Sequence, residues 1–444
     1  MKTQVITNTA IVPFGNELVV NPGTIAWNRD GILAIGSNQS ILSQFPDAEI
    51  IDAKGRIVTP GLINLHTHLY STLARGLTSS GPPPTNFPEI LSSFWWKWDK
   101  CLNLDDVELS AKLGLLDCLS CGLTTVFDHH SSPKAIRGSL EWIAKAYREI
   151  GLRGSLCYEV SDRDGPEVTQ NAIEENLSFS KSLEDDDSKM LMSHFGLHAN
   201  FTLSDSTLQE VVQHINSGGI GIHIHLSEDN SDNRTAKALG YKGPVERLDR
   251  FGLLNEKSLL IHGVHLNPDQ WEIVLNHKSH LIHNPASNLN NAVGIAPVGD
   301  MLEKGLSVGL GTDGYGANML TSANLAALSA KQKVGDPRQG NWALSLLTES
   351  NPRITSLMMN RVIGVLKVGA VSDIVLWDYL PTTPFNNDTV VGHLLFGLQY
   401  AKPENIWVNG DLVWEHGHST NIDQESLIIE AQKRVPELWK RFRE

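Results

Sequence analysis

Short apolar runs that end in polar residues follow one another through the middle of the chain, and helix-like segments separate most of them. The eight runs cover residues 61–68, 123–129, 152–160, 190–198, 220–228, 258–262, 280–284 and 307–313. Strand alternating with helix is typical of a parallel sheet. Eight such units over about 250 residues fit a (β/α)8 barrel, whose functional side chains gather at the C-terminal strand ends. We therefore expect an α/β fold of the TIM-barrel type.

Both ends of the chain carry a different pattern, in which short β-like runs such as 24–27 and 406–414 are divided by turn-forming residues. The simplest layout is a small β-sandwich domain built from both termini, with the barrel inserted between its halves. Pro436 is expected to start the last helical segment of a C-terminal tail. The expected boundaries are 1–58 for the N-terminal part of the small domain, 59–360 for the barrel, 361–420 for the C-terminal part and 421–444 for the tail.

Composition narrows the class of protein. The 444 residues are 41% hydrophobic and 19% charged, as in ordinary globular proteins. The formal net charge of −14 argues against nucleic acid and anionic membranes as partners. No stretch approaches the ~20 apolar residues that span a bilayer. The four cysteines form no disulfide pattern, so we expect a reduced, cytoplasmic protein.

Two histidines one residue apart, His66 and His68, end the first of the eight runs. Residues i and i+2 of a strand point to the same face, so this pair presents two imidazoles to one point, as metal sites require. His225 lies near the end of the fifth run and Asp313 ends the eighth, where a barrel brings strand ends together. A carboxylate at such a buried position is costly unless it is paired, and a metal supplies that pairing. His223 is expected to lie one layer deeper as a hydrogen-bonded residue.

Further polar and aromatic residues flank these four candidate ligands. Glu228 is the last residue of the fifth run and is placed to move protons, and His262 would project from the end of the sixth. Trp95 and Trp96 follow the Pro-rich loop 78–86. They could form the wall of a pocket for a flat ring beneath a lid, and helix packing against the barrel is the alternative.

Several segments together resemble the amidohydrolase superfamily, in its mononuclear branch of deaminases and triazine hydrolases. They are Pro60-Gly-Leu-Ile-Asn-Leu-His-Thr-His68, His225-Leu-Ser-Glu228, His262-Gly-Val-His-Leu266, His283-Asn-Pro-Ala-Ser-Asn288 and Gly311-Thr-Asp-Gly314. Segments 69–76, 128–133 and 392–397, with Trp95-Trp96, are similar to the SsnA aminohydrolase group within that branch. The resemblance covers almost the whole chain.

This resemblance implies a metal-dependent hydrolytic deaminase of a purine, pterin, pyrimidine or triazine ring that releases ammonia. It makes His66, His68, His225 and Asp313 the ligands of one divalent ion, Zn²⁺, with Fe²⁺ as the alternative. The resemblance also implies that Glu228 shuttles protons and that His262 polarises the substrate. It further implies that Asp313 accepts the proton of water and that His198 contacts the substrate. The fourth strand carries no lysine that could bridge a second metal.

Alternatives remain open at this point. A chlorohydrolase or cyclic amidohydrolase would need the same hydroxide, and a metal-containing binding protein without catalysis is an alternative of another class. The partner is expected to be a small heterocycle, with no nucleic acid and no membrane. A homodimer is left open. So are His129 and His130, each of which could orient a ligand or serve the core.

Overall fold

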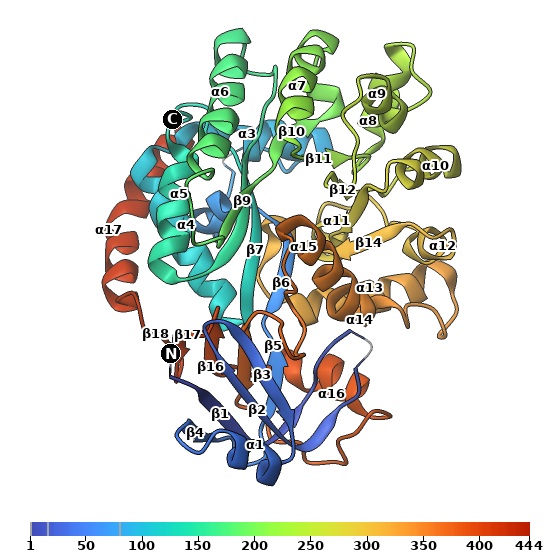
Figure 1. Ribbon diagram of the computed structural model, residues 1–444. Helices are drawn as coiled ribbons and strands as arrows, with labels where there is room; N and C mark the ends of the chain where they lie inside the picture. Colours follow the sequence, from blue (N-terminus) through green and yellow to red (C-terminus); the bar gives the residue numbers. More distant parts are fainter. Residues whose placement is uncertain (1, 16, 80) are drawn as a thin grey trace.

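The computed structural model describes residues 2–15, 17–79 and 81–444. It is an α/β protein in which parallel strands with surrounding helices lie next to a sheet formed by the chain ends (Figure 1). One parallel sheet has the order β6 (Leu62–Thr67), β7 (Leu123–His130), β8 (Arg153–Tyr158) and β9 (Leu191–Ser193). The other has the order β10 (Phe195–Ala199), β11 (Ile222–Leu226), β12 (Leu259–His262), β13 (His280–His283) and β14 (Ser307–Leu310).

The two parallel sheets meet at both of their edges. On one side β9 and β10 are separated only by His194, so the fourth apolar run is one strand with a break. On the other side, the side chain of Asn64 in β6 donates to the hydroxyl of Thr312 after β14 (2.7 Å). The backbone N–H of Thr312 also donates to the carbonyl oxygen of His66 (3.1 Å). Individual hydrogen bonds therefore connect the two sheets at this seam, where the described strands form no continuous ladder.

The helices that cover the strands are amphipathic, and α5 (Ser139–Ile150) is an example. Leu140, Ile143, Tyr147 and Ile150 are buried at the spacing of one helix face. The helix ends at Gly151, whose φ of 86° suits glycine. Further helices of this layer are α4 (Leu104–Ser120), α6 (Pro166–Ser182), α7 (Asp205–Gly218), α8 (Asn230–Ala238), α10 (Pro268–Asn276) and α13 (Met319–Val334).

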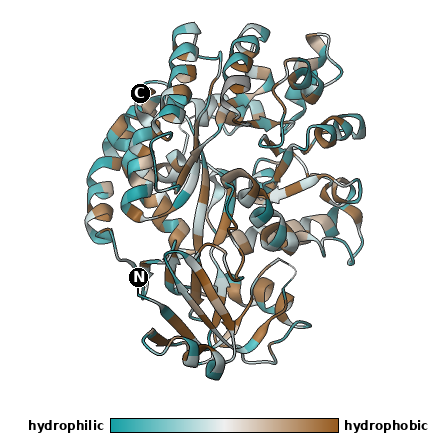
Figure 2. Cartoon of the chain, viewed as in Figure 1, coloured by the Kyte–Doolittle hydropathy of each residue, from teal (hydrophilic) through white to brown (hydrophobic). Residues whose placement is uncertain are grey.

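Hydropathy follows this layering. In Figure 2 the strands are mainly brown, whereas the helices carry teal stretches. Buried aliphatic side chains from the strands and the inner faces of the helices form the largest apolar cluster. Within the described part of the chain, no helix combines the length and the apolar character needed to cross a bilayer.

Strands from both chain ends form a single mixed sheet of nine strands. The sequence predicted a sandwich of two sheets, but the strands pair as one continuous sheet, because β5 connects the N-terminal strands directly to the C-terminal ones. The strands are β1 (Gln4–Ile11), β2 (Val20–Asn28), β3 (Gly31–Gly36), β4 (Glu49–Asp52), β5 (Ile57–Pro60), β15 (Ile374–Trp377), β16 (Pro403–Val408), β17 (Asp411–Glu415) and β18 (His418–Ser419).

The C-terminal tail is one helix, α17 (Gln424–Arg443), with Pro436 inside it. The prediction that Pro436 starts a new helical segment is wrong. Arg434 and Arg441 lie on either side of the proline and both bind the carboxylate of Asp106 in α4 (2.5 Å each). These two ion pairs hold both halves of the helix on the same support, which offsets the hydrogen bond that proline cannot make.

A buried ion pair joins the parallel sheet to the terminal sheet, and it leads to a prediction about stability. Arg153 in β8 and Asp373, just before β15, are both almost completely buried and bind each other directly. Asp373→Asn leaves the guanidinium without a counter-charge, so the free energy of unfolding should fall by about 3–5 kcal/mol. Chemical denaturation measures this change. The control Asp378→Asn removes an exposed partner of Arg56 and should cost less than about 1 kcal/mol; equal losses would contradict the prediction.

Candidate active site

Three histidines from β6 and β11 turn toward one point at the C-terminal strand ends. His66 lies in β6 and is fully buried. His68 is the first residue after β6, and His225 lies in β11. The Nδ1 atom of His68 donates to the backbone oxygen of His129 (2.6 Å), and Nδ1 of His225 donates to that of His198 (2.9 Å). A ring that donates through Nδ1 presents the lone pair of Nε2. These two Nε2 atoms lie 3.2 Å apart.

Asp313, on the turn after β14, faces the same point. Its Oδ1 lies 3.1 Å from Nε2 of His68 and 3.8 Å from Nε2 of His66. Its Oδ2 accepts a hydrogen bond from the hydroxyl of Ser287 (2.6 Å). Tetrahedral ligands about 2.0–2.1 Å from a zinc ion are about 3.3 Å apart from one another. The separations between these donors therefore suit a metal ion.

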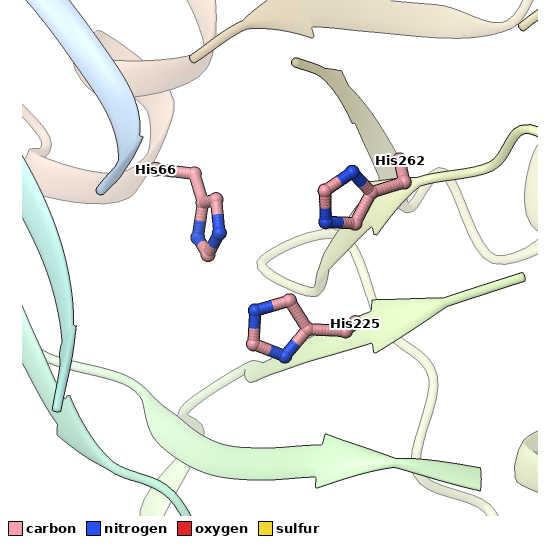
Figure 3. Close-up of side chains that lie close together, drawn as sticks. All are labelled: His66, His225 and His262. Atoms are coloured by element: carbon pink, nitrogen blue, oxygen red, sulfur yellow. The ribbon is translucent and has the colours of Figure 1, made fainter. Parts of the chain in front are cut away.

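The state of two of the three imidazoles supports the same conclusion. Burial lowers the pKa of His66 and His225 well below the ordinary value, which keeps both rings neutral near pH 7, the form that binds metals. At His68 the carboxylate of Asp313 outweighs burial and raises the pKa to about 9, and a metal ion bound at Nε2 would replace that proton. Among the described residues, Nε2 of His66 has no hydrogen-bond partner although it is buried. Figure 3 shows the rings of His66, His225 and His262 around a common space. A divalent metal ion fits this donor set and would satisfy the unpartnered nitrogen.

Backbone strain marks three strand ends at this site. Ser227 after β11, His262 at the end of β12 and Asp313 after β14 have φ values of 48°, 75° and 56°. Non-glycine residues adopt this left-handed region uncommonly and at a cost. The distortion ends the strand geometry at each position, and it lets Glu228, His262 and Asp313 turn into the site instead of continuing the ladder.

Glu228 and His262 lie together beside the metal-binding donors. Nδ1 of His262 donates to Oδ1 of Asn288 (2.8 Å), and its Nε2 lies 3.4 Å from Glu228 and 3.7 Å from Asp313. Burial raises the pKa of Glu228 well above the usual range, and the charge of Asp313 raises it further. A bound cation would offset the effect of Asp313 but not that of burial. Glu228 can therefore carry a proton near neutral pH.

A cavity opens above these groups and encloses about 880 Å³, its mouth included. Its wall contains His198 together with Trp95 and Trp96, so the structure brings the predicted substrate-contacting residues to the cavity. Of the loop 78–86, residue 80 lies outside the described residues, and the other eight are not among the residues that line the cavity; Phe87, directly after the loop, is. The described residues thus place the aromatic wall, and not the Pro-rich loop, next to the site.

The histidines whose roles were left open or assigned to the interior occupy distinct positions. Nε2 of His129 donates to the carbonyl oxygens of Leu197 and His223 (3.1 Å each), and the backbone oxygen of His129 orients His68. His130 instead bonds to the hydroxyl of Ser132 (2.8 Å). His223 shares a hydrogen bond with Nδ1 of His66 (2.8 Å), one layer deeper, as its place in the strand predicted.

The sequence interpretation assigned no role to several residues that hold the site in place. Asn288 orients His262, and Ser287 holds Asp313. Asn291 donates to Glu228 (3.2 Å) and to the hydroxyl of Ser287 (3.3 Å). These residues connect the two carboxylates through hydrogen bonds. The motif at residues 283–288 could have pointed to these roles, because it contains Ser287 and Asn288.

A second group that sequence reasoning missed lies where the third apolar run ends. Glu159 follows β8 and is buried, and its Oε1 accepts a hydrogen bond from Arg163 (3.0 Å). Burial raises the pKa of Glu159 to about 7. The guanidinium of Arg163 also binds Asp99 and Asp164, and it lies 5.3 Å from the ring centre of Trp96. The position of Glu159 near the end of an apolar run could have marked it as a candidate site residue.

The sequence profile of the amidohydrolase family matches residues 57–413, and the chain belongs to this family. Curated relatives support the assignment over nearly the full length. The chain is 30% identical over 439 residues to a 5-methylthioadenosine/S-adenosylhomocysteine deaminase of Pelotomaculum thermopropionicum, with 98% of each chain covered. It is 31% identical to the protein of that name from Thermococcus onnurineus, covering 92% of this chain and 93% of the relative.

Solved structures share the fold. An adenosine deaminase from Xanthomonas campestris with bound zinc superposes with a TM-score of 0.86 at 20% identity, covering 98% of each chain. Atrazine chlorohydrolase from Arthrobacter aurescens TC1 with zinc gives a TM-score of 0.81 at 21% identity, covering 97% of this chain and all of the other. The family prediction made from the motifs is confirmed, and fold neighbours of this kind imply a TIM barrel with a second domain.

Proposed function

We propose that this chain is a metal-dependent aminohydrolase that hydrolytically deaminates an N-heterocycle and releases ammonia. The reaction takes place at the C-terminal strand ends of a (β/α)8 barrel, residues 59–360, to which both termini add a small domain. One observation carries the proposal. His262 lies 3.4 Å from Glu228 and 3.7 Å from Asp313, and polar atoms of all three residues lie within 4.8 Å of one another, directly beside three imidazoles directed at one point. Holding a metal alone gives Glu228 and His262 no role.

The proposed cofactor is one Zn²⁺ ion, with Fe²⁺ as the alternative. His66, His68, His225 and Asp313 would hold it as three nitrogen donors and one oxygen donor, a set that suits either ion. When bound, such an ion acts as a Lewis acid and makes hydroxide available near neutral pH. Zinc in two structures of the same fold supports this choice.

The residues of the chain divide the proton transfers among them. Asp313 accepts a proton from the attacking water, while Ser287 keeps its second oxygen in place. Glu228 donates its proton to a ring nitrogen and recovers one from the hydroxyl group newly attached to the ring carbon. The proton held by Asp313 passes to the amine, and the carbon–nitrogen bond breaks to release ammonia. His262, held by Asn288, stabilises charge that develops on the attacked carbon's oxygen. His198 and the Trp95–Trp96 wall hold the ring above these groups.

A panel of rings tests the proposed function. Metal-loaded protein is incubated with adenosine, 5-methylthioadenosine, guanine, a pterin, cytosine and an aminotriazine, and ammonia is assayed. Because relatives at about 30% identity are named for adenosine derivatives, purines are expected to give the highest rates. A chlorotriazine that releases chloride, with no ammonia from any ring, would favour the chlorohydrolase alternative. Ring binding without either product would favour a binding protein.

A further inference from the structure

Glu159 and Arg163 form one side of the cavity, apart from the proposed proton-transfer groups. Arg163 follows β8 by five residues and its side chain is 9% exposed. Its Nε donates to Asp164 (3.1 Å), its Nη1 to Glu159 (3.0 Å), and its Nη2 to Asp99 and to Ser131 (3.1 Å). All three nitrogens are therefore engaged within the protein. The guanidinium acts as a support for Glu159, and it is not a free cation that could bind an anionic substrate.

The second carboxylate oxygen of Glu159 is directed differently. Among the described residues, no donor makes a hydrogen bond to Oε2, and Nδ1 of His129 lies 3.6 Å from it. Glu159 lines the cavity, and a carboxylate oxygen of Glu159 lies within 4.8 Å of ring nitrogens of His198 and His225. A substrate ring above the proposed metal site can therefore reach this oxygen. A buried acceptor that Arg163 holds in place calls for a donor on the ligand.

The charges that line the cavity point in the same direction. Its described lining contains five acidic side chains, one guanidinium, that of Arg163, and no lysine; Glu228, which carries a proton near neutral pH, adds no negative charge. The five are Glu159, Glu228, Asp229, Asp232 and Asp313. Three acidic partners already neutralise Arg163. The divalent ion that the site fits would balance charge around Asp313, but the wall at Glu159 keeps an excess of acceptors. Like charges placed together cost several kcal/mol, so this wall disfavours anions.

We propose that Glu159, positioned by Arg163, is a specificity-determining residue that accepts a hydrogen bond from an N–H or O–H group of the substrate and disfavours substrates with phosphate or carboxylate groups. The inference rests on the proposed function and narrows its substrate class to uncharged or cationic rings that carry such donors. Trp96 lies over Arg163 and makes an edge contact with His198, with ring centres 6.1 Å apart. Trp96 therefore packs between Arg163, which positions Glu159, and His198 on the same wall of the cavity.

Glu159→Gln tests the proposal because glutamine keeps the size of the side chain and an acceptor for Arg163 but loses the charge. In assays at about pH 8, above the pKa of about 7 of Glu159, kcat/KM for the best uncharged substrate of the panel should fall about 10- to 100-fold, mainly through KM, because a hydrogen bond to a charged acceptor is lost. Metal content should not change. The control Glu174→Gln, an exposed residue of α6 paired with Arg137, should leave kinetics unchanged. Unchanged kinetics in Glu159→Gln would overturn the proposal, and so would loss of metal, which would make Glu159 a ligand.

If Glu159→Gln does not fold, binding measurements on a protein that retains Glu159 still test the proposal. Metal-loaded Glu228→Gln protein, which should turn over slowly, is titrated calorimetrically with adenosine and guanosine and with their 5′-monophosphates. The nucleosides should bind at least about 100-fold more tightly than the monophosphates. Equal or tighter binding of the monophosphates, or no binding of any of the four, would overturn the proposal. Binding with this preference but without turnover in the wild-type protein would count against the proposed function alone.

Two further ligands identify the donor that Glu159 accepts. 2′,3′-Dideoxyadenosine lacks the 2′- and 3′-hydroxyls of the ribose, and 9-methyladenine lacks a ring N–H that adenine has. If Glu159 accepts from ribose, the dideoxynucleoside should bind about 10-fold or more weakly than adenosine. If it accepts from the ring, 9-methyladenine should bind that much more weakly than adenine. The exocyclic amine of both analogues belongs at the reacting carbon, beside Glu228. Undiminished binding of both would therefore overturn the proposal, because neither the 2′- and 3′-hydroxyls nor the ring N–H would then be recognised.

Discussion

Glu228→Gln is expected to lower kcat by about 10²- to 10⁴-fold, the usual contribution of general acid–base catalysis. Glutamine preserves the size of the side chain and can still accept the hydrogen bond from Asn291, but it cannot transfer a proton. Steady-state assays of ammonia release measure the change. Because Glu228 is not among the proposed metal ligands, metal content and the thermal unfolding temperature should stay close to those of the wild-type protein.

The matched control is Glu303→Gln, an exposed residue at the end of α12 (Val298–Glu303), which should leave kcat unchanged. Turnover by Glu228→Gln within a few-fold of the wild type would remove Glu228 from the mechanism. A loss of activity accompanied by loss of metal would also contradict the account, since it would make Glu228 a ligand instead of a proton carrier.

Removal of the metal ion is expected to have an effect at least as large. Dialysis against a chelator should lower kcat by more than about 10³-fold, because Lewis-acid stabilisation of a transition state is worth several kcal/mol. Addition of about one equivalent of Zn²⁺ per chain should restore activity. Elemental analysis together with activity measures both quantities. A requirement for two equivalents, or full activity in the metal-free protein, would contradict a single-metal site.

Two histidine variants distinguish loss of a metal ligand from the general effects of replacing a histidine. His68→Asn removes a proposed ligand whose Nε2 lies 3.1 Å from Asp313, and it should reduce the bound metal strongly. His416→Asn removes an exposed ring that pairs with Glu404 (2.8 Å), and it should leave metal content unchanged. Equal metal content in the two variants would show that His68 is not a ligand.

Much of the site could be predicted because it depends on strand geometry alone. The i, i+2 parity of a strand put His66 and His68 on one face, and the ends of parallel strands gathered His225, His262 and Asp313. These side chains lie together in the structure. The repeat of strand and helix indicated the parallel sheets for the same reason, since each helix must cover the apolar strands beside it.

The remaining features depend on contacts between segments that no local pattern encodes. Glu159 becomes part of the cavity because Arg163, held by Asp99 from a different loop, supports it. Pro436 stays within α17 because two arginines reach the same aspartate of α4. The terminal strands form one sheet, because pairing between the two chain ends decides how they are arranged. Long-range pairing of this kind cannot be read from periodicity.

Turnover in oxygen-18-labelled water tests the central claim most directly. Metal-loaded protein is incubated with the best substrate of the panel, and ammonia and the labelled product are quantified together. The account predicts one labelled oxygen in the product, at the carbon that carried the amine, for each ammonia released, and no reaction after the metal is removed. Ammonia released without incorporation of labelled oxygen, or at the same rate from metal-free protein, would contradict metal-dependent hydrolytic deamination.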